Sequence, residues 1–405
     1  MSEQVSPLIA WFIVISVALI PGAATIFVLM SLITDVRIPY HKRPPVDEPL
    51  TILVAAYNEA SAIADTLASV GHQDYPGPVR VIVIDDGSTD ETAAMVEAFI
   101  AANRHPRMTV DLIRQPKNGG KSHALNTGLA EVETRLTVTI DGDTYLHREA
   151  LSNIVKAMVY AEPKVAAVAG CILVRNSRTN FLTKMQEWDY FHGIGVVKRA
   201  QSLYHGTLVA QGAFSIYDTA ALREAGGWRE VVGEDIVLTW TLRGNGHNVG
   251  YSECAFAFTN APTSFRQFFR QRQRWARGLI EAFKSTPQAI VQLRLNSPFV
   301  WYNMFFPLID FAYLFILVPG IIAAFFGYHL IAGLLTLLLV PMVIIGTAIY
   351  YKYEKEIFDE HDLHVRRNFL GLLGYMFVYQ FIMAAASLSG YFNEFFNLKK
   401  NWGTK

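Results

Sequence analysis

The stretch from residue 8 to residue 33, LIAWFIVISVALIPGAATIFVLMSLI, contains no charged side chain. An α-helix needs about 20 consecutive apolar residues to cross the hydrocarbon core of a bilayer, and this stretch is long enough. A secretory signal peptide is the alternative. However, the preceding MSEQVSP has no basic residue, and the apolar run is longer than the core of a signal peptide. We therefore predict an N-terminal transmembrane helix within residues 1–36.

Three further apolar runs lie near the end of the chain, at 305–327, 329–350 and 368–392, and the last of them is the most polar. Apolar residues make up 52% of the 405 residues and charged residues only 17%. An ordinary soluble domain has about 25% charged residues. The excess of apolar residues is confined to the four runs, because the long middle segment has a normal soluble composition. The pattern predicts a membrane protein with one soluble domain.

The basic residues around the first run predict its orientation. Arg37, His41, Lys42 and Arg43 follow the run, whereas the residues before it have no lysine or arginine. Because basic residues concentrate on the cytoplasmic side of a membrane, we expect a cytosolic middle domain and an N-terminus outside, in an inner (plasma) membrane protein.

The chain has two cysteines, Cys171 and Cys254, and both stand in apolar segments with the pattern of strands. Buried free thiols are the simplest expectation for such positions, and they are compatible with a reducing compartment. A catalytic role is the less favoured alternative.

The middle segment alternates strand and helix patterns. Short apolar runs typical of strands occur at 51–56, 79–85, 108–114, 135–141 and 208–216, and helical spacing occurs at 60–70 and 91–103. This alternation predicts a parallel α/β sheet. Ligands of such sheets bind at the carboxyl ends of the strands, and most of the polar clusters of this segment follow its strands.

Three of these clusters have chemistry suited to a phosphate or a metal. Asp141 and Asp143 flank a glycine, so both carboxylates can face one space, where a hard cation such as Mg²⁺ or Mn²⁺ would offset their repulsion. Asp86 ends a neighbouring strand, and Lys121 follows two glycines, a setting that suits a phosphate. An ordinary solvated turn is the alternative for each cluster taken alone.

Glu234 and Asp235 stand directly before an amphipathic helical run. A carboxylate at a helix N-terminus is commonly a cap or a partner of the helix dipole. The alternative is a general base, namely a partly desolvated carboxylate that removes a proton from a substrate hydroxyl.

Residues 265–278, FRQFFRQRQRWARG, combine five arginines with aromatic residues. A nucleic-acid patch is disfavoured because 35 Lys and Arg balance 35 Asp and Glu over the chain. The phenylalanines recur at helical spacing, which predicts either an interfacial helix or a helix packed on the protein core. We assign Arg266, Arg270, Arg272 and Arg277 to anionic lipid or solvent.

The motifs AAYNE, DDGSTD, NGGK-x-x-ALN, DGDT, GED and Q-x-x-RW, in this order, resemble those of family 2 glycosyltransferases. The resemblance covers about residues 50–280 and the flanking apolar runs, and it points to the membrane-embedded processive branch, which includes poly-N-acetylglucosamine, chitin, hyaluronan and cellulose synthases. It implies an α/β GT-A fold (a Rossmann-like mixed sheet) and a nucleotide-sugar donor, with inversion at the anomeric carbon.

The resemblance also implies roles for individual residues. The donor would be bound by Tyr57, Glu59, Asp86, Lys121, Asp141, Gln271 and Arg274. Asp143 would hold Mg²⁺ or Mn²⁺, Asp235 beside Glu234 would be the catalytic base, and Trp275 would stack on the acceptor sugar.

The last residues, NWGTK at 401–405, resemble a W-G-T-[RK] element that hyaluronan and chitin synthases carry near the active site on the cytosolic side. Three late spans would place this element outside, so we favour an interfacial or re-entrant position for 368–392. The expected domains are the span at 1–36, the GT-A domain at 48–262, interfacial helices at 263–300, and transmembrane or interfacial helices with the tail at 301–405.

These features lead to one favoured function. We expect a processive β-glycosyltransferase that polymerises N-acetylglucosamine from UDP-GlcNAc into an exported polysaccharide. The alternatives are a β-glucan synthase using UDP-glucose, a lipid-acceptor glycosyltransferase that adds one sugar, and a non-catalytic scaffold. The expected partners are the UDP-sugar, the growing polysaccharide, the bilayer and an accessory export or regulatory subunit, with no nucleic acid.

Overall fold

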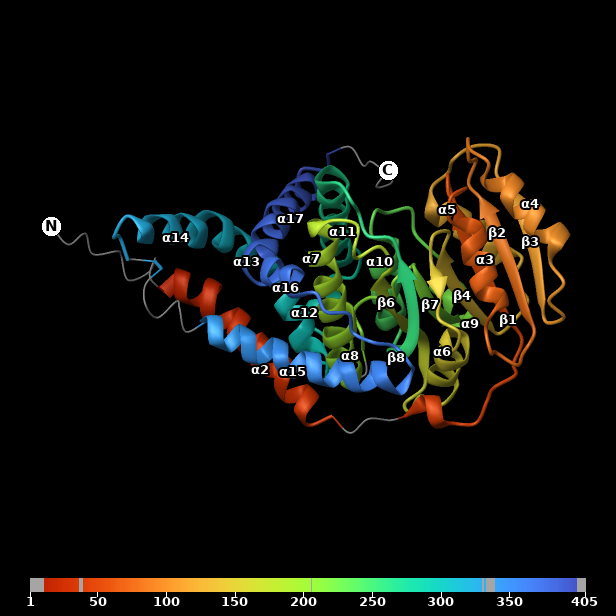
Figure 1. Ribbon diagram of the computed structural model, residues 1–405, viewed down its shortest axis with the longest axis horizontal. Helices are drawn as coiled ribbons and strands as arrows, with labels where there is room; N and C mark the ends of the chain where they lie inside the picture. The colour runs from red at the N-terminus through yellow and green to blue at the C-terminus, as the bar shows by residue number, and fades with distance from the viewer. Residues whose placement is uncertain (1–10, 36–38, 205, 330, 333–338, 399–405) are drawn as a thin grey trace.

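A computed structural model of the protein describes residues 11–35, 39–204, 206–329, 331–332 and 339–398. One mixed sheet of eight strands forms the centre of this structure (Figure 1). The strands are β1 (Leu50–Ala56), β2 (Val79–Asp85), β3 (Met108–Arg114), β4 (Leu136–Asp141), β5 (Tyr145–Leu146), β6 (Val165–Val174), β7 (Phe214–Asp218) and β8 (Asn248–Thr259). Their order is β3-β2-β1-β4-β7-β6-β8-β5. Strands β1 to β4 are parallel, whereas β7 is antiparallel to both of its neighbours.

Helices cover both faces of the sheet. Apolar side chains of α3 (Ile63–Gly71), α4 (Thr92–Ala102) and α6 (Ala150–Val159) form one core cluster with the strands. Those of α5 (Lys121–Ala130), α9 (Thr219–Glu224) and α10 (Glu234–Gly244) form a second cluster with the strands. Because successive strand residues face opposite sides, a strand with both faces covered must be apolar throughout. This is why near-continuous apolar runs predicted β1, β2 and β4 to within one residue. The edge strand β3 is only partly buried, and its bounds also agree with the prediction.

The prediction of a strand over 208–216 is wrong in its bounds, since β7 begins only at Phe214. The backbone before it bonds to side chains instead of a neighbouring strand. The N–H of Leu208 donates to Gln201 at 3.1 Å, and that of Ala210 donates to Thr239 at 2.9 Å. The segment is therefore a buried loop, whose apolar residues mimic a strand.

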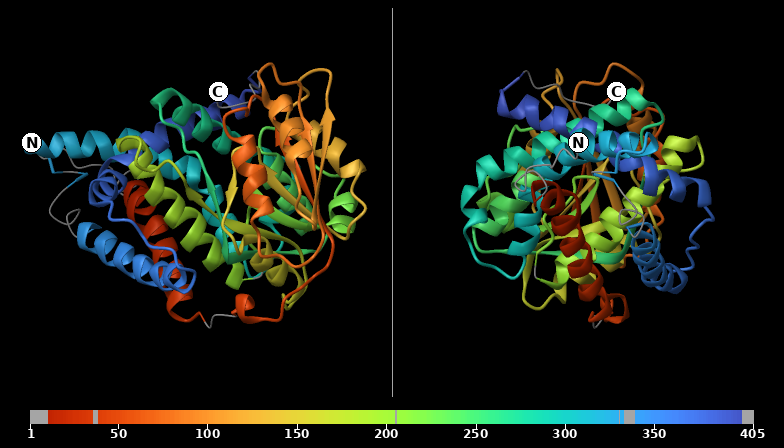
Figure 2. Two further views of the ribbon diagram at one scale, coloured as in Figure 1. Left: turned by 45° about the vertical axis from the view of Figure 1, so that its right-hand side comes forward. Right: turned by 90° about the vertical axis from the view of Figure 1, so that its left-hand side faces the viewer.

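Three helices in the described part of the chain are long and apolar enough to cross a membrane: Trp11–Ile33, Phe306–Phe325 and Phe369–Phe395. The first contains α2 (Ile20–Ile33), the second α13 (Phe306–Ala312) and α14 (Val318–Phe325), and the third α16 (Phe369–Gly374) and α17 (Gln380–Phe395). The run predicted at 329–350 lies partly outside the described residues, and its described part begins α15 (Leu339–Glu360). Helices α2 and α14 lie at one end of the molecule, away from β1 to β3, and α15 runs from that end toward the sheet (Figures 1 and 2).

Two further groups of helices join the sheet to these apolar helices. The first comprises α7 (Phe181–Tyr190), η3 (Phe191–Val196) and α8 (Val197–Leu203). The second comprises α11 (Phe265–Ser285), η4 (Pro287–Ile290) and α12 (Ser297–Met304). The short helix η2 (Tyr40–Lys42) follows α2, and the π-type turns η1 (Val14–Leu19), η5 (Tyr313–Leu317) and η7 (Tyr375–Tyr379) interrupt the apolar helices.

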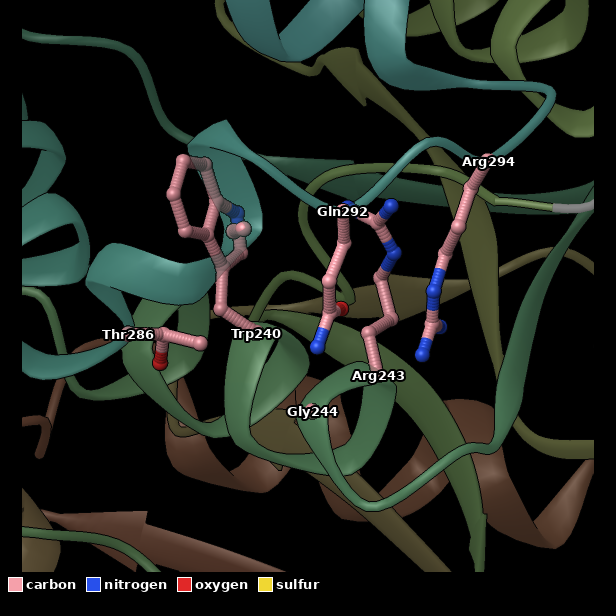
Figure 3. Close-up of a pocket in the computed structure, with 7 residues that line it drawn as sticks. Trp240, Arg243, Gly244, Thr286, Gln292 and Arg294 are labelled. Atoms are coloured by element: carbon pink, nitrogen blue, oxygen red, sulfur yellow. The ribbon is translucent and has the colours of Figure 1, made fainter.

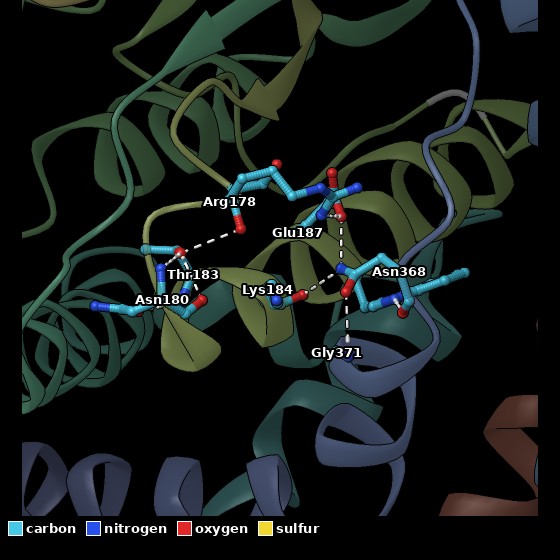
Figure 4. Close-up of polar contacts among 9 residues, drawn as sticks. Arg178, Asn180, Thr183, Lys184, Glu187, Asn368 and Gly371 are labelled. Atoms are coloured by element: carbon cyan, nitrogen blue, oxygen red, sulfur yellow. Dashed lines mark hydrogen bonds and ion pairs between the residues drawn. The ribbon is translucent and has the colours of Figure 1, made fainter.

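Asn368 fixes the start of α16 on α7. Its side chain accepts the N–H of Gly371 at 3.1 Å and donates to the carbonyl of Lys184 at 2.8 Å (Figure 4). Glu187 of α7 also contacts this amide and forms an ion pair with Arg178 at 2.7 Å. The N-terminal end of the last apolar helix is thus attached to α7.

Candidate active site

A cavity of about 330 Å³ opens between the sheet, α10 and α11. Its size is in the range of small-molecule sites. Among the predicted site residues, those that line it are Lys121, Asp141, Glu234, Asp235, Gln271, Arg274 and Trp275. They come from four separate stretches of the sequence, so the fold brings together most of the predicted set.

Lys121 links the two acidic sides of this cavity. Its ammonium forms an ion pair with Asp141 and lies 3.9 Å from Oε1 of Glu234. Burial disfavours the charge of Lys121, but these two carboxylates outweigh burial and raise its pKa to about 12. Lys121 therefore remains a cation, and its contact with a donor remains a prediction.

Asp86 organises the glycine turn before Lys121. Its two carboxylate oxygens accept the N–H groups of Gly119 and Gly120, each at 2.8 Å, and its side chain is buried. Gly120 has a φ of +91°, a conformation that residues with a Cβ rarely adopt. Asp86 thus positions Lys121 through the backbone, and a direct contact with a donor remains a prediction.

Tyr57, Glu59 and Asp143 do not line the cavity. Asp143 accepts a hydrogen bond at 3.3 Å from Thr259, a lining residue. The side chain of Glu59 lies against Gly142, where an added Cβ would come within 3.0 Å of its Cγ. Tyr57 is exposed at the end of β1. Their roles in donor binding remain predictions.

Glu234 and Asp235 begin α10 at the floor of the cavity. Burial and the charge of Asp235 raise the pKa of Glu234 to about 7, although Lys121 and Arg274 oppose the shift. Asp235 is half-buried and accepts the N–H of Gly212 at 3.4 Å. The N-cap residue Gly233 has no side chain, but Oδ1 of Asp235 accepts the N–H of Ile236 in the first turn of α10 at 2.8 Å. Asp235 thus stabilises the start of the helix, and its role as a general base remains a prediction.

Two glycines bring α10 and α11 into backbone contact. A Cβ on Gly278 would lie 2.8 Å from Cα of Gly233, and a Cβ on Gly233 would lie 2.4 Å from Cα of Gly278. The N–H of Gly233 also donates to Glu281 at 2.9 Å. Since Gly278 lies one helical turn after Arg274, this contact sets the distance between the Glu234–Asp235 pair and the arginine.

Helix α11 presents two polar groups without partners in the described residues. Oε1 of Gln271 and Nε of Arg274 are buried and make no hydrogen bond there, and both residues line the cavity. Buried polar atoms are normally satisfied, so such atoms in a cavity point to a ligand that completes them. The N–H of Arg274 suits a phosphate oxygen, whereas Oε1 of Gln271 accepts and suits a hydroxyl or N–H group of a ligand.

Trp275 stands at the cavity with 44% of its surface exposed. The guanidinium of Arg272 lies 4.0 Å from the centre of its ring, and the ring of Tyr190 lies 6.2 Å away. Arg272 also forms an ion pair with Asp189 at 2.9 Å. This stack fixes the orientation of the indole ring, and stacking of an acceptor sugar on Trp275 remains a prediction.

The assignment of Arg272 and Arg277 to lipid or solvent is wrong. Arg272 is 2% exposed, and Arg277 is 5% exposed and forms an ion pair with Glu394 of α17 at 3.2 Å. Both face partners far away in the sequence, which the local pattern could not reveal. Arg266 and Arg270 are exposed. Helix α11 therefore packs along α17 with a face that includes buried arginines.

Lys198 of α8 is a cavity residue that the sequence did not indicate. It is buried, and its ammonium donates to the carbonyl of Val209 at 2.7 Å. Burial lowers its pKa to about 7, although Asp235 opposes this shift. The local sequence VVKRA at 196–200 gives no indication that Lys198 lies in a cavity. The cavity forms only when residues 208–213 fold over α8.

A second, smaller pocket lies behind α10, lined by Trp240, Arg243, Thr286, Gln292 and Arg294 (Figure 3). Its volume of about 10 Å³ is enough for one water molecule. A nucleotide sugar does not fit there, so the larger cavity is the candidate active site.

Comparisons with known proteins agree with this geometry. A family model described as "Glycosyltransferase like family 2" matches residues 45–278, more than half of the chain. A poly-β-1,6-N-acetyl-D-glucosamine synthase of Staphylococcus aureus (strain COL) is 30% identical over 261 residues, which are 62% of this chain and 61% of that protein. One of Staphylococcus epidermidis is 32% identical over 244 residues, 59% of this chain and 57% of that protein.

Among solved structures, a mannosyltransferase of Pyrobaculum calidifontis in complex with GDP-Man and Mn²⁺ aligns with a TM-score of 0.64 and 20% identity. The alignment covers 96% of this chain and 99% of that protein. At this identity the likeness shows a shared fold. It agrees with the GT-A-like mixed sheet predicted from the sequence.

Proposed function

The chain belongs to the glycosyltransferase-like family 2, and from this premise we propose that it is an inverting, processive β-glycosyltransferase. Its donor is UDP-GlcNAc, and its product is an exported polymer of N-acetylglucosamine. The choice of sugar rests on the relatives named poly-β-1,6-N-acetyl-D-glucosamine synthase. The region matched by this chain spans about three fifths of the length of each relative.

Trp275 and Asp235 line the same cavity, and this shared placement carries the proposal of a sugar acceptor. In the proposed reaction, an acceptor sugar stacks on Trp275 and directs a hydroxyl toward Asp235, which takes up its proton. The hydroxyl oxygen forms a bond to C1 of the donor sugar while the bond from C1 to the diphosphate oxygen breaks. UDP leaves with the electron pair, and the configuration at C1 is inverted. No covalent enzyme intermediate is required.

Cations of the chain stabilise the leaving diphosphate in this scheme. Lys121 and Arg274 line the cavity on the sides where the phosphates would lie, and Gln271 offers a further polar contact. Positive groups that meet charge as it develops lower the barrier most in a partly desolvated site. Glu234, close to Lys121, keeps the ammonium in place before the donor arrives.

A divalent ion fits the residues at the end of β4. Asp143, together with Asp141 on the same turn, offers the oxygen ligands that Mg²⁺ or Mn²⁺ takes when it also binds substrate phosphates. When bound, the ion would neutralise charge on the leaving diphosphate. The turn itself is held by Thr66, whose hydroxyl donates to the carbonyl of Gly142 at 2.9 Å.

We further propose that residues 48–262 form a cytosolic catalytic domain, that 263–300 lie at the membrane surface, and that the product leaves through the helices of 1–36 and 301–405. Apolar helices long enough to cross a membrane flank the domain on both sides in the sequence. An accessory subunit for export or regulation remains an expectation.

One experiment tests donor and product together. The purified full chain is incubated with radiolabelled UDP-GlcNAc or UDP-glucose and Mg²⁺ or Mn²⁺, with Asp235→Asn as the inactive control. We expect a ladder of products from UDP-GlcNAc that a glycosidase specific for β-1,6-linked poly-N-acetylglucosamine degrades. A single product extracted into organic solvent would establish the lipid-acceptor alternative. Incorporation from UDP-glucose alone would establish the β-glucan alternative.

A further inference from the structure

A cluster of two histidines and a cysteine lies outside the cavity. His41 belongs to η2, which follows the first apolar helix, Cys254 belongs to β8, and His361 belongs to the turn after α15. One ligand atom of each residue lies within 4.8 Å of the other two. Cys254 and His361 are buried, and His41 is half-buried. Three segments far apart in the sequence thus meet through metal-binding side chains.

The distance between His41 and Cys254 suits two ligands of one ion. Nδ1 of His41 lies 3.7 Å from Sγ of Cys254. For tetrahedral zinc with a Zn–N bond of about 2.05 Å and a Zn–S bond of about 2.3 Å, the two ligand atoms would be about 3.6 Å apart. Little rearrangement of this pair would be needed to place an ion between them.

His361 is oriented as a ligand histidine usually is. Its Nδ1 lies 2.7 Å from a carboxylate oxygen of Glu149, so the proton of the ring sits on that side. Its Nε2 is buried and has no hydrogen-bond partner among the described residues. Metal-binding histidines commonly donate the other ring N–H to a carboxylate, which leaves a lone pair for the ion.

A plain hydrogen bond between Cys254 and His41 is the simpler explanation for that pair. It does not account for His361, since a buried lone pair without a partner is costly. A metal ion satisfies all three side chains at once, because thiolate and neutral imidazole are both preferred ligands of zinc.

We propose that His41, Cys254 and His361 bind one Zn²⁺ ion, with Glu149 orienting His361 and a water molecule in the fourth position. This site is distinct from the carboxylate turn at Asp143, because its nitrogen and sulfur ligands select a different class of metal. The bound ion joins the linker after the first apolar helix to the sheet and to the end of α15. Its role is to hold the catalytic domain in a fixed position on the membrane helices.

Cobalt binding tests the site without an activity assay. The full chain is purified in detergent, its affinity tag is removed, and it is treated with chelator and titrated with Co²⁺. We expect one equivalent of Co²⁺ to bind with a thiolate-to-cobalt charge-transfer band, and one equivalent of Zn²⁺ to abolish it. Co²⁺ bound to carboxylates at the donor site would give no such band.

Substitutions identify the ligands. We expect Cys254→Ser to lose the charge-transfer band, and Glu149→Gln to retain it with an affinity about 10–100-fold weaker, as is typical when the carboxylate behind a ligand histidine is removed. Cys171→Ser is the matched control, because Cys171 is the other buried cysteine. Its spectrum should equal that of the unmodified chain.

Two outcomes would overturn the proposal. The first is the absence of the charge-transfer band in the unmodified chain at saturating Co²⁺. The second is an unchanged band in Cys254→Ser. Elution as a single species and unchanged UDP binding would show that each variant is folded, so a lost band would report on the ligand and not on unfolding.

Discussion

At the scale of single residues, Asp235 is the one on which the proposed chemistry depends most. General base catalysis contributes about 10²–10⁴-fold to a rate, so Asp235→Asn should lower kcat by a factor of this order. Binding of UDP should change little, because Lys121 and Arg274 remain in the cavity. Initial rates and UDP affinity of the purified variant check this expectation. Full activity of Asp235→Asn would remove Asp235 from the role of base.

Glu234 should make stability depend on pH. Its pKa is about 7 in the folded protein, against an ordinary value of 4.5. Between these values the folded state binds more protons than the unfolded state, so this group lowers stability as the pH rises from about 4.5 to about 7. The Glu234→Gln variant does not lose stability in this way, because its side chain does not titrate. We expect its Tm relative to the unmodified chain to increase across that window and to stay constant above it.

The matched control for this experiment is Glu230→Gln, because Glu230 is exposed four residues earlier in the chain. Its Tm relative to the unmodified chain should show no such trend. A Tm difference for Glu234→Gln that does not vary with pH would contradict a buried carboxyl at this position.

Residues within the family motifs were predictable, and residues fixed only by tertiary contacts were not. Lys121, Asp141 and Asp235 follow strands or precede a helix, so the sequence carries their position as well as their chemistry. Arg272 and Lys198 stand in local patterns typical of exposed residues. Their burial depends on Asp189 and on the loop that contains Val209, and no local pattern encodes those contacts.

At the scale of elements, the contact between α10 and α11 depends on Gly278. Alanine is favoured over glycine in a helix by about 1 kcal/mol, so propensity alone would make Gly278→Ala stabilising. The added Cβ would lie 2.8 Å from Cα of Gly233, and overpacking of this kind costs about 1–3 kcal/mol. We expect the second effect to dominate, with a lower Tm and a lower kcat.

Gly193 provides the comparison for Gly278. It lies in the helical turn η3, is exposed, and has no atom within 4 Å of the position of an added Cβ. Gly193→Ala should keep kcat and raise Tm slightly. If the two alanine variants behaved alike, the close approach of α10 and α11 would not control the geometry of the site.

The strands of the sheet were predictable from the sequence where apolar residues mark a buried strand. They were not predictable where an apolar segment is a buried loop. Strands β1, β2 and β4 are buried over almost all of their length, so each produces a largely apolar run of the right length. The edge strand β3 is only partly buried, and its run is interrupted by Asp111. The segment before β7 is as apolar as a strand because it lines the cavity and packs on α8 and α10. Composition does not distinguish these two kinds of burial.

At the scale of the whole molecule, the chain returns to the catalytic domain after its second and third apolar runs. Ile357 and Phe358, near the end of α15, pack into a core cluster of the sheet, and His361 contacts Glu149 of the domain. In the proposed membrane arrangement, residues 354–368 therefore lie on the same side of the membrane as the domain. An even number of crossings between Phe306 and Glu354 is the simplest path that allows this.

Both ends of the last apolar helix, residues 369–395, also contact this domain. Asn368 bonds to α7, which ends at the cavity residue Tyr190, and Glu394 forms its ion pair with Arg277, less than one turn from Arg274. In Figure 1, α17 rises steeply beside α11, whereas α2, α14 and α15 extend to the left. A helix of this length can cross a bilayer, since it measures about 40 Å. The contacts of its two ends instead favour a position along the membrane surface.

Accessibility of introduced cysteines distinguishes these positions. Phe326→Cys, Phe396→Cys and Arg107→Cys each add a thiol at an exposed position, while the native cysteines are buried. In intact cells, an impermeant maleimide should label Phe326→Cys, at the end of α14, and should spare Phe396→Cys and Arg107→Cys until the membrane is permeabilised. Labelling of Phe396→Cys from outside would show that 369–395 crosses the membrane. The buried Arg277–Glu394 pair could then not lie on the cytosolic side with the cavity.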